Sequence, residues 1–231
     1  MENTSWKILP NGLGGESLYI SSGADISGIP SSFQKIITDE HAAILANPSD
    51  YLSSLAKRSR LAGMQQWFTT MANANRCGLI IHTAVMPTGN VQTAIAIRGL
   101  LPSPKGYSDF LMASGLPVDH FPDALKSVYE LIDGTSEAGG FASGGLDYPH
   151  NFDFSDYPLD DTSHLLNLDN ALVFYTTDCG DVLCADGNKV FWFRHEDCRF
   201  IQVGDLEEIV ASYFTSDLAG SEWVPDPYDI D

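Results

Sequence analysis

The chain has 231 residues, 44% of them hydrophobic, and a formal net charge of −19. This length can bury a sizeable core and can form one large domain or two small ones, of which we expect two. No apolar run approaches the roughly 20 residues that a membrane span requires, and the first ten residues lack the apolar segment of a signal peptide. These features predict a cytoplasmic protein without a membrane partner.

The negative charge is concentrated in the second half of the chain. Residues 1–115 carry 8 Lys+Arg and 7 Asp+Glu, whereas residues 116–231 carry 4 and 24, a net charge of −20. Such a surface repels nucleic acid and anionic lipid, and it accelerates the encounter with a basic partner by long-range attraction. Halophilic adaptation or a need for solubility would spread the acidity more evenly. The asymmetry favours a basic protein partner and argues against nucleic acid.

The first half predicts helices followed by a β-hairpin. Residues 17–21 resemble a strand, and apolar residues at helical spacing predict one helix from Pro30 to Asn47 and another after Pro48, with a break near Gly63. Two apolar segments flank Pro87-Thr88-Gly89-Asn90 and predict the hairpin, with strands over residues 78–86 and 91–98.

A proline- and glycine-rich segment, residues 102–106, is the best candidate for a linker, because it stops both helix and sheet. We therefore expect three parts. These are an N-terminal α+β module of unknown role over residues 1–105, a second domain over residues 106–220 and an acidic tail over residues 221–231. In the second domain, residues 107–114 suggest one or two helical turns, and a helix follows Pro122 and ends at Gly134, where a positive φ is expected.

Residues 135–167 form a long segment in which four glycines precede an acidic and aromatic stretch. Aromatic rings supply buried contact area at protein interfaces, and carboxylates select a basic partner. This composition predicts a partner-binding surface made of Asp147, Tyr148, Phe152, Asp153, Asp156, Tyr157, Asp160 and Asp161. The alternative is an irregular covering loop whose rings complete the core.

Residues 170–214 predict an antiparallel meander closed by a helix. Strands are expected over residues 171–176, 181–186, 189–194 and 200–203, with a two-residue turn at Gly187-Asn188. Asp205 stands in N-cap position with Glu208 three residues later, as in a capping box. Leu206, Ile209, Val210 and Tyr213 share one helical face.

Several clusters of polar residues could suggest a metal-binding or acid-base site, but their spacing matches no known motif. Acidic residues and His195 lie at the turns of the meander, without the pattern of an EF-hand or an H-E-x-x-H helix. A zinc site made of Cys179, Cys184, His195 and Cys198 would lack paired C-x-x-C knuckles. No phosphate-binding loop and no G-x-S-x-G elbow occurs in the sequence. We expect no catalytic residues, no metal and no cofactor, and we expect the four cysteines to be reduced thiols.

Three segments of the second half resemble the SUKH superfamily, which includes a yeast regulator of cell-wall synthesis and many bacterial immunity proteins. Residues 116–134, with Leu116-Pro117 and Asp133-Gly134, look like the opening helix of the family. Residues 172–186 look like its central strands with the Gly180-Asp181 turn. Residues 190–214 look like the next strand, with its His195-Glu196 ending, and the closing helix. The resemblance covers residues 115–218 and leaves residues 1–105 outside.

The resemblance implies an α+β fold, in which a SUKH-like antiparallel sheet is flanked by helices, and a role without catalysis. Many bacterial members of the family bind and neutralise a polymorphic or contact-dependent toxin. The leading hypothesis is therefore an immunity protein that binds a basic, nuclease-type toxin. One alternative is a regulatory or scaffold protein of the cell-wall-synthesis-regulator type. A third hypothesis is a metal-dependent hydrolase that uses the His195-Glu196-Asp197 turn.

Overall fold

Two antiparallel sheets and six helices make up the computed structural model, which confirms the predicted α+β class. The structure describes residues 6–10, 16–74, 77–85, 88, 90–101, 106–136, 145–177, 180–221 and 223. Residues 102–105 of the expected linker, most of the glycine-rich segment and most of the acidic tail fall outside these ranges. No helix in the described part of the chain is long and apolar enough to cross a membrane.

The first sheet has the strand order β1-β2-β3-β4-β5-β6 and the second has the order β11-β10-β9-β8-β7. The strands of the first sheet are β1 (Trp6–Pro10), β2 (Glu16–Ser21), β3 (Cys77–Val85), β4 (Val91–Leu100), β5 (Tyr107–Met112) and β6 (Ile132–Ser136). Those of the second are β7 (Gly145–Asn151), β8 (Leu172–Thr176), β9 (Val182–Asp186), β10 (Lys189–Arg194) and β11 (Arg199–Asp205). The predicted hairpin and the predicted meander are both present.

The helices are α1 (Ser31–Gln34), α2 (Asp39–Ala46), α3 (Pro48–Arg58), α4 (Ala62–Ala74), α5 (Asp123–Tyr129) and α6 (Leu206–Ala219). The helix predicted from Pro30 to Asn47 is wrong as a single element. It is interrupted before Thr38, whose side chain accepts a hydrogen bond from the backbone N–H of His41 and starts α2 with a capping box. The capping box predicted at Asp205 is absent, because its side chain makes no cap hydrogen bond.

Two predictions for the segment after residue 105 are wrong. Residues 107–112 form strand β5 rather than helical turns, and Gly134 lies inside strand β6 rather than after a helix. Gly134 has φ of 151°, and a Cβ at this position would lie 2.3 Å from the backbone oxygen of Leu146 in β7. Glycine thus allows β6 and β7 to approach closely where the two sheets meet.

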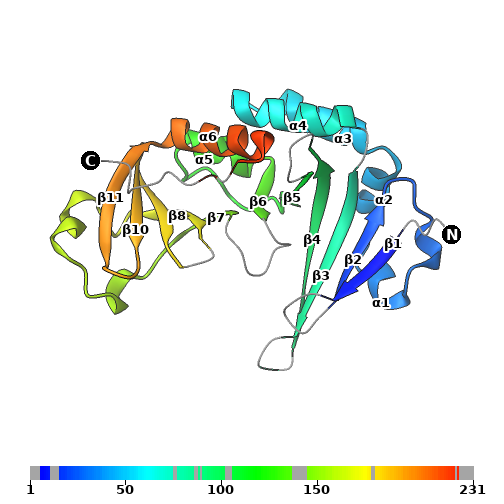
Figure 1. Ribbon diagram of the computed structural model, residues 1–231, viewed down its shortest axis with the longest axis horizontal. Coiled ribbons are helices and arrows are strands. Elements are labelled where there is room, and N and C mark those ends of the chain that lie inside the picture. The colour runs from blue at the N-terminus through cyan, green and yellow to red at the C-terminus, as the bar shows by residue number, and fades with distance from the viewer. Residues whose placement is uncertain are drawn as a thin grey trace.

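One continuous hydrophobic core joins the helices and both sheets. Figure 1 shows α4 and α6 on the same side of the molecule, with the two sheets extending away from them and splaying apart. Trp67 of α4 packs its ring against Phe110 of β5 and Phe214 of α6, with centroids 5.5 and 5.3 Å apart. Its indole Nε1–H donates to Asp217 Oδ2 at 2.7 Å. Because β5 pairs with β4 and β6 pairs with β5, the first sheet extends across the boundary that we expected at residue 105.

The second sheet is buried on both faces, which explains why its strands are almost continuously apolar. Side chains such as Leu183 and Trp192 point into the main core, whereas Cys184 and Phe193, their neighbours in sequence, point to the opposite face. There they form a separate, smaller core. Residues 152–170, the segment between β7 and β8, cover this smaller core, and we call them the covering loop.

Candidate functional site

The covering loop is ordered by its own aromatic and aliphatic side chains. Phe154 is 4% exposed and packs its ring against Phe193 of β10 and Phe200 of β11, with centroids 5.1 and 5.2 Å apart. Tyr157 also packs against Phe193 at 5.1 Å, and Leu166 is buried. Apolar burial therefore anchors the loop to the sheet at both ends of its length.

Two aspartates of the covering loop shape its turns. Asp153 precedes a 3-10 helix, η2 (Phe154–Asp156), and accepts a hydrogen bond from the backbone N–H of Ser155 at 2.9 Å. Asp160 precedes the 3-10 helix η3 (Asp161–Leu165) and accepts from the backbone N–H of Thr162 at 2.8 Å. Hydrogen bonds from the hydroxyl groups of Ser155 and Thr162, supplemented by these backbone N–H groups, lower the pKa of the Asp153 and Asp160 carboxyl groups and favour their ionised forms.

Asp160 has a further structural role, because its Oδ2 lies 3.1 Å from Nε of Arg199 on β11. The hydroxyl of Thr162 in turn accepts a hydrogen bond from the backbone N–H of Phe200 at 2.7 Å. Polar contacts thus attach η3 to the edge strand of the second sheet. Such cover also prevents the edge from pairing with another chain.

The structure divides the eight residues predicted for partner binding into two groups. Asp147 and Tyr148 were expected in the loop, but they lie in strand β7. The β7 pairing is irregular after Leu146, and Pro149 lies inside the strand, which is tolerated at an edge position. This irregularity removes the alternating pattern by which a strand is recognised in the sequence.

Asp147 and Tyr148 are engaged with the protein itself. Thr176 Oγ1 donates to Asp147 Oδ2 at 2.6 Å, and burial raises the pKa of this carboxyl. The hydroxyl of Tyr148 donates to the backbone oxygen of Pro117 at 2.9 Å, and its ring packs against Phe121. These two residues are half-buried and help to join β7 to the main core.

The other six predicted residues lie together in the covering loop, where their roles differ. Asp153 and Asp160 cap the 3-10 helices, and Phe152 and Tyr157 are half-buried against the smaller core. Asp156 and Asp161 are exposed. The rings therefore complete a core, as the alternative reading expected, while the exposed carboxylates stay accessible to a partner.

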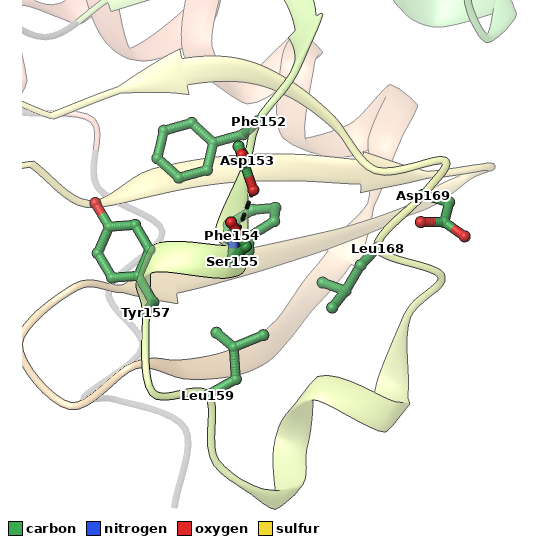
Figure 2. A pocket seen from close by; sticks show the side chains of 8 residues that line it. All are labelled: Phe152, Asp153, Phe154, Ser155, Tyr157, Leu159, Leu168 and Asp169. Atoms are coloured by element: carbon green, nitrogen blue, oxygen red, sulfur yellow. Dashed lines mark hydrogen bonds between the residues drawn. The ribbon is translucent and has the colours of Figure 1, made fainter.

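A groove with a volume of about 380 Å³ opens in the covering loop. Its lining is made of Phe152, Asp153, Phe154, Ser155, Tyr157, Leu159, Leu168 and Asp169. In Figure 2, Phe152 and Tyr157 stand at one side and Leu168 and Asp169 at the other. The floor and walls are mainly apolar, and carboxylates stand at the rim. Five lining residues were missing from the predicted set. Phe154 and Ser155 lie within the predicted stretch, whereas Leu159, Leu168 and Asp169 adjoin the rings only after the loop folds back on itself.

Few cations are available to neutralise this surface. Residues 145–177 contain six aspartates and neither lysine nor arginine. Three of the four Lys and Arg residues after residue 115 already form ion pairs, Lys126 with Asp119, Arg194 with Asp197, and Arg199 with Asp160. The remaining carboxylates of the loop consequently create a negative field over the groove.

At the polar turns of the meander, the carboxylate of Asp181 is occupied by hydrogen bonds within the protein. Asp181 Oδ1 lies 2.7 Å from His195 Nδ1 and accepts from the backbone N–H of His195 at 3.0 Å, while Oδ2 accepts from Trp192 Nε1 at 3.1 Å. Asp181 therefore fastens the β9 and β10 ends together. Cys184, considered above as a zinc ligand, is fully buried in the smaller core, and Cys179 lies outside the described residues.

Within the described ranges, no three His, Cys, Asp or Glu side chains come together in a way that could hold a metal ion. Cys77, Cys184 and Cys198 are free thiols. Searches against protein-family models, curated proteins and solved structures gave no significant match for this chain. The covering loop with its groove is the best candidate for a functional surface.

Proposed function

We propose that this chain is a non-catalytic immunity protein that binds and neutralises a cognate bacterial toxin with a basic, nuclease-type surface. The resemblance of residues 115–218 to the SUKH superfamily is part of this proposal. The observation that carries it is the covering loop, an ordered and strongly acidic surface without Lys or Arg, fixed to a rigid sheet by buried rings.

The rigidity of the loop favours tight binding. Ordering a loop on association costs roughly 0.5–1.5 kcal/mol for each immobilised side chain. Here Phe154 and Leu166 are already buried, and Asp153 and Asp160 already cap their helices, so much of this cost is met during folding. The backbone that carries the exposed carboxylates is therefore ordered before the partner arrives.

The charge of the loop supports fast association. Complementary charge raises association rate constants from about 10⁵–10⁶ M⁻¹s⁻¹ towards 10⁸–10⁹ M⁻¹s⁻¹ at low salt. An inhibitor that must act before a toxin damages its host gains directly from this acceleration. An acidic surface can also imitate the phosphates that a nuclease binds, and half-buried rings can pack against the toxin beside its cleft.

The test is survival of a sensitive host that expresses the protein encoded by the neighbouring gene, with and without this chain. The proposal expects the neighbour to be toxic, and it expects rescue that accompanies formation of a one-to-one complex in a pull-down. A toxic neighbour that this chain neither binds nor neutralises would contradict the proposal.

The contribution of the loop is tested with Asp156→Lys combined with Asp161→Lys. Both side chains are exposed, and neither caps a 3-10 helix, so the loop should keep its fold. Asp160 is left unchanged because reversing its charge would break a cap and an ion pair. The matched control reverses two exposed charges on the first-half surface, Glu16→Lys with Glu40→Lys. Protection should fall in the loop variant and persist in the control.

A second candidate function is a regulatory or scaffold module that recruits a basic partner to a cell-wall or signalling complex. The same acidic loop supports it, because the surface selects a partner by charge and not by activity. A harmless neighbouring gene product, together with capture of a basic protein that depends on Asp156 and Asp161, would favour this function over immunity.

A further inference from the structure

We propose that the groove in the covering loop receives an arginine side chain of the partner. Its aliphatic stem would lie against Leu159 and Leu168, and its guanidinium would lie against the rings of Phe152 and Tyr157, beside the carboxylate of Asp153. This inference rests on the proposed function and specifies the chemistry of its partner.

The apolar part of the groove fits the stem of a long side chain. Phe152, Tyr157, Leu159 and Leu168 are all half-buried, so each keeps apolar surface that the folded chain does not cover. The volume of about 380 Å³ is near the lower end for ligand sites, which typically measure roughly 300–1,000 Å³. A groove of this size suits one extended side chain better than a folded peptide segment.

The charged part of the groove selects a cation. Asp153 adjoins Phe152 at one side, and Asp169 stands at the opposite rim (Figure 2). A purely apolar occupant would remove the charged Asp153 and Asp169 carboxylates from water without supplying a counter-cation, which is costly. An anionic occupant, such as a phosphate group, would be repelled, because residues 145–177 contain no Lys or Arg to receive it. A cationic occupant satisfies both requirements.

The rings favour arginine over lysine. Phe152 and Tyr157 lie with centroids 5.9 Å apart and planes inclined by 37°, so two neighbouring rings provide an aromatic platform at one side of the groove. A guanidinium is planar and weakly hydrated, and it stacks on aromatic faces while it donates hydrogen bonds to a carboxylate in its own plane. An ammonium group is compact and strongly hydrated, and it gains less from such a platform.

The probe is a blocked tripeptide, acetyl-Ala-Arg-Ala-amide, titrated into the full isotope-labelled chain and followed by NMR. The comparison peptide replaces arginine by citrulline, which has nearly the same shape but no charge. The arginine peptide should shift the amide signals of the groove residues in a saturable manner, whereas the citrulline peptide should not. Equal binding of both peptides, shifts confined to another surface, or no shifts at the solubility limit would overturn the inference.

Two variants distinguish binding in the groove from long-range attraction by the acidic surface. Each removes one negative charge, at a different position. Asp153→Asn deletes a charge at the groove but keeps an oxygen that can cap Ser155, since Asn is as good an N-cap residue as Asp. Asp156→Asn deletes a charge three residues away, outside the groove lining. The first should weaken arginine-peptide binding by about threefold to tenfold, and the second by less than about twofold. Equal effects would mean that long-range charge alone attracts the peptide.

The outcome is distinguishable from failure of the proposed function. If the arginine peptide does not bind but the chain still rescues a host from its toxin, the groove is not the contact and the immunity function stands. If the peptide binds as expected but no toxin is neutralised, the groove is a cation site with another partner.

Discussion

Replacing Phe154 by alanine should detach the covering loop from the second sheet. The ring is 4% exposed and packs between Phe152, Phe193 and Phe200, with centroid distances of 4.7, 5.1 and 5.2 Å. Truncation of a buried Phe to Ala costs about 3–5 kcal/mol, through lost burial and the cavity left behind. We expect about 3 kcal/mol, at the lower end of this range, because a surface loop can partly collapse into the space.

The loss should be local and visible by hydrogen exchange. The backbone N–H of Phe200 on β11 bonds to Thr162 Oγ1, and the backbone N–H of Asp160 bonds to the backbone oxygen of Cys198, just before β11. Both bonds join the loop to the sheet, so these two N–H groups report directly on loop docking. If loop detachment is the opening event, 3 kcal/mol corresponds to exchange that is about 100-fold faster at these groups. Amides of the hairpin formed by β3 and β4 should be much less affected.

Leu165→Ala is the matched control, because Leu165 lies in the same loop with 45% of its surface exposed. It should change stability by no more than about 0.5 kcal/mol. If Phe154→Ala changes the exchange of the reporter amides no more than Leu165→Ala does, the ring does not anchor the loop and our account of its rigidity is wrong. Protection against the toxin should fall in the Phe154 variant alone, because its loop must be ordered again on binding.

Other parts of the structure give three further predictions. Trp67→Phe removes the donor to the buried Asp217 carboxylate and part of a core ring, and it should lower the free energy of unfolding in urea by about 2–4 kcal/mol. Burial raises the pKa of Asp147 in the folded state, so its ionisation lowers stability once the pH rises above the pKa of the unfolded state. Asp147→Asn should therefore raise the melting temperature at pH 7 relative to the unmodified chain. This gain should vanish at low pH, where Asp147 is protonated in both states. Burial raises the pKa of the Cys77 and Cys184 thiols to about 12, so mass spectrometry should find both unmodified by iodoacetamide at pH 8 until the chain is unfolded; rapid labelling of the native chain would contradict their burial.

The sequence pointed to the stretch that forms the candidate site, but it did not reveal how the stretch is built. The composition of residues 147–161 marked an acidic and aromatic surface, and six of the eight predicted residues do lie in one loop. Asp160, however, holds the loop to Arg199, and Tyr148 supports the main core. These roles depend on groups far away in the sequence, and no local pattern specifies them.

The first sheet shows a similar limit. Its central hairpin was predicted because an apolar alternation and a turn lie within about 20 residues of each other. Strand β5 was missed because its interior carries Asp109, which is 0% exposed and forms a two-pronged ion pair with Arg98 at 2.7 and 2.6 Å. A buried carboxylate breaks the apolar pattern of a strand, and only its partner on β4 makes it acceptable.

The sequence by itself determined the elements whose signals are local. These are the α+β class, the hairpin, the meander of the second sheet and the concentration of negative charge after residue 115, because periodicity, turn residues and charge can be read within short windows. Tertiary structure alone decided that β5 and β6 complete the first sheet, that the second sheet is covered on both faces, and that a groove opens between Phe152 and Leu168. The physical reason is that strand pairing and side-chain packing depend on contacts between segments far apart in the sequence. No local pattern distinguishes the native partner of a strand from other possible partners.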